Sequence, residues 1–517
     1  MRTAVAISVL AFALLAAGMF VTQASNWHVI GGSDNAFLAE CLDNIAERGL
    51  PYTSVNRASH RYITLLHDFA EVDDFSEAVA PAPPHEINQF HRHSYVALYL
   101  LAPFTKWFDP AMVLTAAKTL SLTALVALGF VLLLRRSGRP WHALAFAALV
   151  VAHPFFMHCL SWQVYVDFLF LPAGFLLCIG LRTRPGSWST LLLALLCCLV
   201  CEKFIFVTAL LTGTFALLFH RGRTRRSMVY AAGGLLVLFL VVSRTARWIE
   251  PDYSVRPHYQ YGTWLEILLS AGSLRNSATL LFVSFAVYVP LLLRDRRLIA
   301  LLLVALLPNL LGSVGGAEKI GWPTHYHITY FPVLAFALYE ALALRARDGG
   351  ARSPAGMLAF GSGLLLATCH PLVVDVRNVP DGWQTSTSSQ WFVLQCAEVQ
   401  QRHAASEPTL AHLRALAEKV PAGSRLSVSA NLATTLYPGR SLDFFPIGIE
   451  QADLLVLYAT DYRRDERGVS LVLPPFSTDE QANRRFARFV QERSSERFDL
   501  DRPEAFGPWL LFSRRTD

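Results

Sequence analysis

The sequence predicts an α-helical polytopic membrane protein with a C-terminal soluble α/β domain. Hydrophobic residues make up 53% of the 517 residues and charged residues only 16%, whereas soluble proteins carry about 25% charged residues. Apolar runs long enough to cross a bilayer recur as far as residue 372, with short arginine clusters between them. After that residue the charge content becomes ordinary, and helix-like and strand-like segments alternate. We therefore expect a polytopic transmembrane domain over 1–372 and a soluble domain over 373–517.

The first apolar run covers residues 3–24 and has two interpretations. Its length of about 20 residues suffices for an anchor that spans the bilayer. A cleavable signal peptide is the alternative, because Thr22-Gln-Ala24 before Ser25 resembles a small-residue cleavage site. The length of the run favours the anchor.

Ten further segments have the apolar character of membrane spans. The run 188–220 is too long for one span, and Glu202-Lys203 at its middle predicts two helices that turn there. The segment 94–107 is shorter and contains Pro103, so we expect a surface or re-entrant helix. The predicted spans are 111–134, 141–159, 163–182, 188–201, 203–220, 227–243, 278–293, 298–315, 326–344 and 355–372.

The arginine clusters predict the orientation of about 11 spans, because cytoplasmic loops are enriched in Lys and Arg. With a cytoplasmic N-terminus, all the clusters fall on the cytoplasmic face. The large first loop 26–93, the loops 244–277 and 315–327, and the tail then face outward. The clusters begin at Arg135, Arg182, Arg221, Arg294 and Arg345.

The tail is expected to form a small α/β domain, because helices alternate in it with short apolar strands. It contains no glycine-rich phosphate-binding fingerprint, so we assign it no nucleotide. The predicted helices are Glu398–Val420 and Thr478–Arg493, and the predicted strands are Arg425–Ser429, Ser441–Phe445, Asp453–Tyr458 and a strand around Pro508–Phe512.

Charge and cysteine usage exclude several classes of function. The net charge of +6 does not indicate nucleic-acid binding, because the arginines lie in short clusters between apolar runs. Four of the eight cysteines lie within apolar spans, and no CxxC has a partner motif. A disulfide framework and a structural zinc site are therefore not expected. We predict no metal ligands, leave the cofactor open with a divalent metal as one option, and leave the oligomeric state open.

Asp34 is the candidate catalytic residue, in the turn Gly31-Gly-Ser-Asp-Asn35 just beyond the first span. A carboxylate on such a turn can act as a general base or bind a metal ion or a sugar hydroxyl. The alternative is structural, since Ser33 or Asp34 would cap a helix over Ala36–Arg48. One aspartate can serve both purposes.

Charged residues inside apolar segments are the next candidates, because intramembrane carboxylates are rare and usually functional. Asp167 lies within the span 163–182, and Glu202-Lys203 lies between two spans. All three are predicted near the outer ends of their spans. Simple contact with water, or a structural ion pair, is the alternative.

The remaining candidates are cations and imidazoles in the outward loops. Cations suit a phosphate group, whereas aromatic residues stack on sugars or lipids. Snorkelling side chains and the interfacial aromatic belt would give much the same pattern without a ligand. We assign substrate binding to Arg92, His93, Arg256, Lys319, His325 and His327.

The order of these motifs resembles a family of uncharacterised bacterial polytopic membrane proteins, known only as a domain of unknown function. The likeness covers nearly the whole chain and rests on motifs with family counterparts. They are Ser33-Asp-Asn-Ala36, the segment His93–Pro103, Cys201-Glu-Lys203, His325-Tyr-His327 after Leu306-Leu-Pro-Asn-Leu310, and Val420–Ala430 followed by Ala452–Leu457.

More distantly, the layout is similar to the GT-C superfamily of membrane glycosyltransferases, which use polyprenyl-phosphate sugars. The resemblance implies a bacterial inner-membrane enzyme with a lipid-linked sugar donor, contact with membrane lipids, and Asp34 as general base. It further implies that Arg92, Lys203, Lys319 or Arg256 neutralises the leaving phosphate, while His93 or His325 orients it. A transporter or flippase of lipid-linked intermediates and a non-catalytic scaffold are the rival functions.

Overall fold

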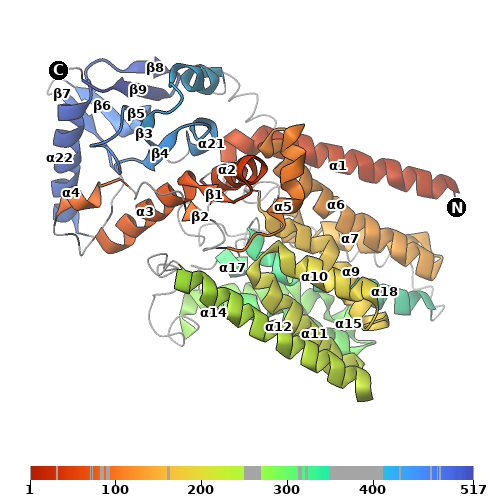
Figure 1. Ribbon diagram of the computed structural model, residues 1–517. Helices are drawn as coiled ribbons and strands as arrows, with labels where there is room; N and C mark the ends of the chain where they lie inside the picture. Colours follow the sequence, from red (N-terminus) through yellow and green to blue (C-terminus); the bar gives the residue numbers. More distant parts are fainter. Residues whose placement is uncertain are drawn as a thin grey trace. The chain divides into compact units, whose positions relative to one another are not determined.

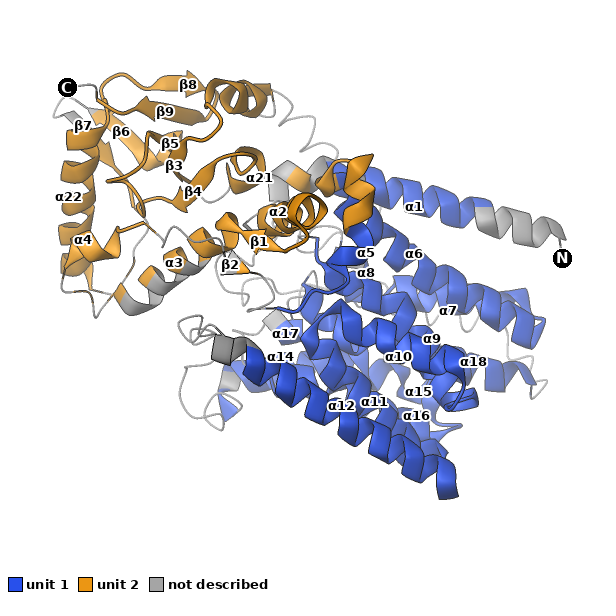
Figure 2. Cartoon of the chain, viewed as in Figure 1, with its two compact units in different colours: residues 1–24, 90–101, 112–399 blue, residues 25–89, 102–111, 400–517 orange. Residues whose placement is uncertain are grey.

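A computed structural model of the chain divides into two compact units (Figures 1 and 2). The membrane unit comprises Met1–Ala24, Phe90–Leu101 and Met112–Val399, and the sheet unit comprises Ser25–Gln89, Ala102–Ala111 and Gln400–Asp517. The structure describes residues 2–30, 33–69, 72, 74–81, 87–88, 93–159, 164–249, 269–312, 317–320, 324–347, 411–429, 432–465, 468–473, 476 and 479–515.

The membrane unit is helical throughout its described residues, as expected for a chain that must satisfy its backbone polar groups in lipid. Its longer helices are α1 (Arg2–Ile30), α6 (Pro110–Ser137), α7 (Pro140–Val151), α9 (Phe170–Thr183), α10 (Trp188–Val200), α11 (Glu202–Phe219), α12 (Gly222–Ile249), α14 (Ala271–Ser284), α16 (Arg296–Leu310) and α18 (Phe331–Arg347). Its short elements are α5 (Leu98–Leu101), α8 (Pro154–His158), η5 (Val166–Leu169), η7 (Ala286–Tyr288), α15 (Val289–Leu292), α17 (Ala317–Ile320) and η8 (His325–Thr329).

Helix α18 lies at the centre of this unit and helix α12 at its edge. Every residue of α18 from Phe331 to Ala343 is buried, and the helix packs against α7, α9, α15 and α16. Helix α12 runs beside α11 and packs on it (Figure 1). It exposes Val237, Leu240 and other large apolar side chains. Such an apolar exposed face is costly in water and favourable in a bilayer.

Fewer helices than the 11 predicted spans are long enough to cross a membrane. Among the described residues, five helical segments meet the length and hydropathy expected of a span. The predicted span 141–159 is broken, because α7 ends before Pro154 and α8 begins there. The 3-10 turns η5 and η7 lie within two of the five segments. The predicted span 355–372 lies outside the described residues. The five segments are Pro110–Ser137, Val166–Thr183, Glu202–Phe219, Gly222–Thr245 and Gly272–Leu292.

Two predicted boundaries bear directly on the site. The division of the run 188–220 is confirmed, because α10 ends at Val200 and α11 begins at Glu202, with Cys201 in an extended conformation between them. The first helix is longer than predicted and continues from the apolar run to Ile30. The first outer loop is therefore helical at its start.

The sheet unit is built around one five-stranded sheet of mixed direction. In the order β4-β3-β5-β9-β8, the first three strands are parallel and the last two pair antiparallel. The strands are β3 (Arg425–Val428), β4 (Ser441–Phe444), β5 (Leu454–Tyr458), β8 (Glu504–Phe506) and β9 (Trp509–Ser513). Helices α21 (Ala433–Leu436) and α22 (Glu480–Arg497) and the hairpin β6 (Tyr462–Asp465)–β7 (Gly468–Leu471) complete it. The predicted α/β character of the tail is confirmed.

Most of the predicted first loop, residues 26–89, belongs to the sheet unit. It contributes α2 (Ser33–Arg48), α3 (Ser54–Asp68), α4 (Phe75–Ala78) and the strand pair β1 (Tyr52–Thr53)–β2 (Ile87–Asn88). Phe69 from this loop shares a hydrophobic cluster with Phe476 and Phe486 of the tail. The predicted division at residues 372 and 373 lies outside the described residues. It did not anticipate that the loop and the tail share one core.

Glu40 fixes α2 to α3 within this unit. Its buried carboxylate accepts hydrogen bonds from the Thr53 hydroxyl, the Ser54 hydroxyl and the backbone N–H groups of Ser54 and Val55. These donors lie at the first turn of α3, where backbone N–H groups lack helical partners. Glu40 therefore caps a neighbouring helix, a role that the sequence did not reveal.

Candidate functional site

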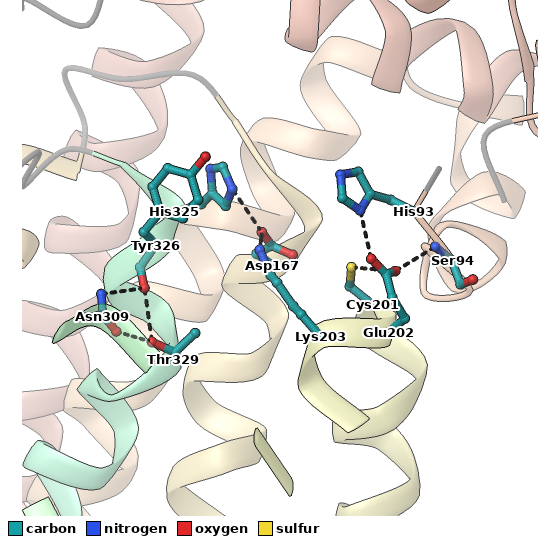
Figure 3. A network of polar contacts seen from close by, with 10 residues as sticks. All are labelled: His93, Ser94, Asp167, Cys201, Glu202, Lys203, Asn309, His325, Tyr326 and Thr329. Atoms are coloured by element: carbon teal, nitrogen blue, oxygen red, sulfur yellow. Dashed lines mark hydrogen bonds and ion pairs between the residues drawn. The ribbon is translucent and has the colours of Figure 1, made fainter. Parts of the chain in front are cut away.

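Five of the predicted site residues converge in the membrane unit (Figure 3). They come from four separate segments of the chain. His93 precedes α5, Asp167 lies in η5, Glu202 and Lys203 begin α11, and His325 begins η8. We call these five residues the polar cluster.

Glu202 is held by three donors from two segments. The His93 Nδ1 atom lies 2.7 Å from Glu202 Oε1, and the backbone N–H of Ser94 donates to Oε2 at 2.7 Å. The Cys201 thiol donates to the same Oε2 at 3.0 Å. The segment before α5 is thereby fixed to the start of α11. The backbone bond from Ala97 N–H to Leu199 O, at 2.8 Å, supports the same junction.

Asp167 forms the second half of the polar cluster. The Lys203 ammonium donates to Asp167 Oδ2, and His325 Nε2 lies 3.9 Å from the same oxygen. The His325 ring packs on Tyr165 with 4.1 Å between ring centroids. Asp167 is fully buried, yet its Oδ1 atom has no hydrogen-bond partner within the described part of the chain, and neither has His325 Nδ1. Buried polar atoms without partners are uncommon, and they indicate a place where a ligand can bind.

The two halves are close enough to act on each other electrostatically. The charges of His93 and Glu202 both act on Asp167. The side chains of His93 and Lys203 remain 37% and 30% exposed, so the cluster can be reached from outside. The helices α9, α11 and α18 all begin within a few residues of it, and helix N-termini carry partial positive charge. The site therefore combines a reachable cation, helix N-termini and free polar atoms, a set that suits a phosphate carrying a hydroxylated group.

Lys319 is placed differently from the polar cluster. It is 2% exposed, and its ammonium donates to Glu318 Oε1, Gly312 O and Ser273 Oγ. Because an ammonium has three donors, these contacts use all of them. We therefore assign Lys319 to the packing of α14, α16 and α17 and leave it out of the site.

His327 also lies outside the polar cluster. Its Nδ1 atom is 3.1 Å from the Tyr330 hydroxyl, which is 2.9 Å from Ser284 Oγ. Ser284 Oγ is in turn 3.0 Å from His153 Nε2. All four side chains are fully buried, so they form a continuous polar chain inside the membrane unit.

Three predicted site residues remain. Asp34 belongs to the sheet unit, where it is the second residue of α2 and partly exposed. A carboxylate in the first turn of a helix is favoured by the helix dipole. The helix begins at Ser33, so Ser33 and Asp34 lie within it and neither precedes it as the predicted cap. Arg92 and Arg256 lie outside the described residues.

Sequence reasoning missed Cys201 as a site residue. It was counted among the apolar cysteines of the spans, but its thiol binds Glu202 directly. Its position next to a charged pair that interrupts an apolar run was the available signal. Tyr165 and Ser94 were missed as well, because their roles depend on long-range contacts that the sequence does not display.

No protein-family model matches this chain, and a search of curated proteins found no match.

Proposed function

We propose that the protein is a GT-C-like membrane glycosyltransferase that moves a sugar from a polyprenyl-phosphate donor to an acceptor on the periplasmic side of the bacterial inner membrane. The observation that carries the proposal is the polar cluster, in which a reachable lysine lies beside buried, unpartnered atoms of Asp167 and His325. A phosphate-linked sugar supplies both an anion and several hydroxyl groups. The phosphate anion matches the Lys203 ammonium, and the hydroxyl groups match the unpartnered atoms of Asp167 and His325.

The roles follow from the charge and position of each residue. Lys203 and the N-terminus of α11 would bind the donor phosphate, which leaves with a negative charge. Asp167 Oδ1 would accept a hydrogen bond from a sugar hydroxyl, and His325 Nδ1 would bind a second one. His93 would position Glu202, and thereby the first turn of α11.

The transfer itself needs a base, and the resemblance to GT-C enzymes suggests Asp34. Its carboxylate would take the proton of the acceptor hydroxyl as that oxygen attacks the anomeric carbon of the sugar. The bond from that carbon to the phosphate oxygen breaks, and its electron pair stays on the phosphate. Lys203 stabilises this developing charge.

The placement of arginines within the membrane unit supports an outward-facing site. The polar cluster lies at the N-terminal ends of α9 and α18, whereas Arg182 lies in the last turn of α9 and Arg345 and Arg347 in the last turn of α18. Cytoplasmic ends of spans are rich in arginine, so the opposite ends face outward. The proposed topology of about 11 spans puts the cluster on that side.

The test is donor turnover by purified protein given polyprenyl-phosphate sugars. We expect Lys203→Met to lower kcat by about 10²–10³-fold, the usual effect of removing one group that stabilises transition-state charge. Asp34→Asn and Asp34→Ala should both abolish turnover. Matched controls are Arg184→Gln, an exposed cation of the membrane unit, and Asp501→Asn, an exposed acid of the sheet unit. Absence of turnover by folded wild-type protein with every donor would refute the proposal, and turnover unchanged in both Asp34 variants would remove Asp34 from catalysis.

A transporter of lipid-linked intermediates is the second candidate, and the buried chain from His153 to His327 favours it. Polar residues inside a membrane unit often mark a proton or substrate pathway. Protein reconstituted in vesicles would then move a fluorescent lipid-linked sugar between leaflets. Tyr330→Phe should slow this movement if the buried chain takes part, and an unchanged rate would remove the chain from the pathway.

A further inference from the structure

We propose that His93, Cys201 and Glu202 form a binding site for one zinc-like divalent transition-metal ion. Metal binding itself rests on the geometry of these three residues alone. The part that the metal plays at the donor phosphate rests in addition on the proposed function.

The three side chains present one ligand atom each to a common point. His93 Nδ1, Cys201 Sγ and a Glu202 carboxylate oxygen all lie within 4.8 Å of one another. Ligand atoms around a tetrahedral zinc ion lie about 3.3–3.8 Å apart, given bond lengths of about 2.0–2.3 Å. The present contacts of 2.7 Å and 3.0 Å to Glu202 are proton-bridged. If these two protons are lost, small rotations of the side chains would move the three ligand atoms far enough apart to hold a metal ion.

The surroundings match those of a site built to hold its ligands. The Ser94 N–H donates to Glu202 Oε2 and orients the carboxylate, as second partners of metal ligands do. Cys201 is fully buried, whereas the His93 side chain is 37% exposed. The fourth coordination position would thus face the reachable side, where water or a phosphate oxygen can bind.

The charge balance also favours an ion at this place. Asp167 and Lys203 neutralise each other, which leaves the Glu202 carboxylate as the remaining fixed charge. A divalent cation bound by a thiolate and a carboxylate forms a neutral group, and neutral groups are the least costly to place beside an apolar helix bundle. A donor phosphate could then bind at the open position without meeting an uncompensated negative charge.

The ligand types decide which metal is expected. A thiolate with an imidazole suits zinc or cobalt, whereas magnesium prefers oxygen ligands only. The site should therefore bind Zn²⁺ and Co²⁺ and discriminate against Mg²⁺. This preference separates it from a general attraction of acidic groups for cations.

The test uses the purified full-length protein, stripped with a chelator and titrated with Co²⁺ as a spectroscopic probe. We expect one equivalent to bind with a thiolate-to-cobalt charge-transfer band, which Zn²⁺ removes and excess Mg²⁺ does not. Cys201→Ser should abolish the band, while Cys198→Ser, a matched change near the end of α10, should keep it. His93→Ala should weaken Co²⁺ binding by at least about 10-fold. Because His93 is the most exposed ligand, that variant keeps the test valid if Cys201→Ser fails to fold.

Two outcomes would overturn the metal site. One is the absence of a charge-transfer band in folded wild-type protein, and the other is a band that survives Cys201→Ser or His93→Ala unchanged. Sugar transfer that proceeds fully in chelator-stripped protein would remove the metal from the reaction and leave the proposed function intact. Metal binding as expected, together with no transfer to any acceptor, would refute the proposed function and leave the metal site standing.

Discussion

The membrane unit contains the dipeptide Glu-Lys twice in its described residues, and the two copies behave in opposite ways. At Glu318-Lys319 the two side chains bind each other at 3.2 Å and are only 4% and 2% exposed. At Glu202-Lys203 each side chain turns to a different partner, and they are 16% and 30% exposed. Both pairs lie in the first turn of a helix.

The difference is caused by residues that are distant in sequence. His93 and Asp167 draw Glu202 and Lys203 apart and leave the ammonium at an accessible surface. The Lys319 ammonium instead uses its donors on Glu318 and on the oxygens of Gly312 and Ser273. We call Glu318-Lys319 the closed pair and Glu202-Lys203 the open pair. The closed pair holds helices together, whereas the open pair can bind a ligand.

The largest expected effect comes from removing the Glu318 charge of the closed pair. Glu318→Gln leaves the buried Lys319 charge without its counter-ion, and we expect a loss of about 3–5 kcal/mol of stability. The same change in the open pair, Glu202→Gln, should cost only about 1 kcal/mol, because its partner His93 is 37% exposed and solvent screens the pair. Thermal unfolding of the purified protein in detergent compares the two variants directly.

A double variant sharpens this prediction. Replacing Glu318 and Lys319 together with methionine removes both buried charges, so the double variant should be more stable than Glu318→Gln. Equal losses from Glu318→Gln and Glu202→Gln would contradict the distinction between a closed and an open pair.

A substitution beside the closed pair should have an intermediate effect. A Cβ atom added at Gly312 would lie 2.5 Å from Glu318 Cγ and 3.3 Å from Pro308 O. We expect Gly312→Ala to cost about 1–3 kcal/mol, because the Glu318 side chain must move away from Lys319. Gly272→Ala is the matched control, since that position has open space around it and lies next to Ser273. The control should be neutral or raise stability by up to about 1 kcal/mol; a loss as large as that of Gly312→Ala would argue against a specific clash.

The smallest expected effect concerns an acid whose described charged neighbours are other acids. Burial raises the pKa of Asp43 in α2 to about 6, and the nearby charges of Asp109, Glu47 and Glu40 add to the shift. Because the folded-state pKa is raised, the stabilising contribution is complete below the ordinary pKa of 3.8 and is lost as pH rises through about 6.

Asp43→Asn should therefore remove a pH dependence in this window. Relative to the variant, the wild-type sheet unit should lose stability between about pH 4 and 6. Asp43 is only partly buried, so solvent screening limits the difference to less than about 1 kcal/mol. Hydrogen exchange of peptides covering α2, measured across this range, provides the comparison. A constant difference between the two proteins would show that Asp43 does not titrate there.

Much of the local structure was predictable because it depends on neighbouring residues. The charged pair at Glu202 marked the end of α10 and the start of α11, and short apolar stretches marked β3, β5 and β9. The lengths of the helices were harder to predict. Hydropathy averages over a window and does not register that α7 ends just before His153-Pro154, or that α9 begins only after the 3-10 turn Val166–Leu169.

The site was predictable by residue type but not by arrangement. Rare charges in apolar runs identified Asp167, Glu202 and Lys203, and the structure brings these together with His93 and His325. Lys319 was selected as a cation of the predicted loop 315–327, because the sequence does not show whether a cation is enclosed by its neighbours. Cys201 escaped notice for a similar reason, since its contact with Glu202 requires the turn between two helices.

The shared core of the sheet unit has a consequence for how the chain is made. Leu65 and Phe69 pack against Phe476 and Phe486, which the ribosome adds some 400 residues later. At typical synthesis rates of about 5–20 residues per second, Leu65 and Phe69 lack these packing partners for roughly 20–80 s after they are synthesised. The first loop therefore remains without its packing partners until translation is nearly complete, which makes it a natural client for a chaperone on the side of the membrane where it emerges.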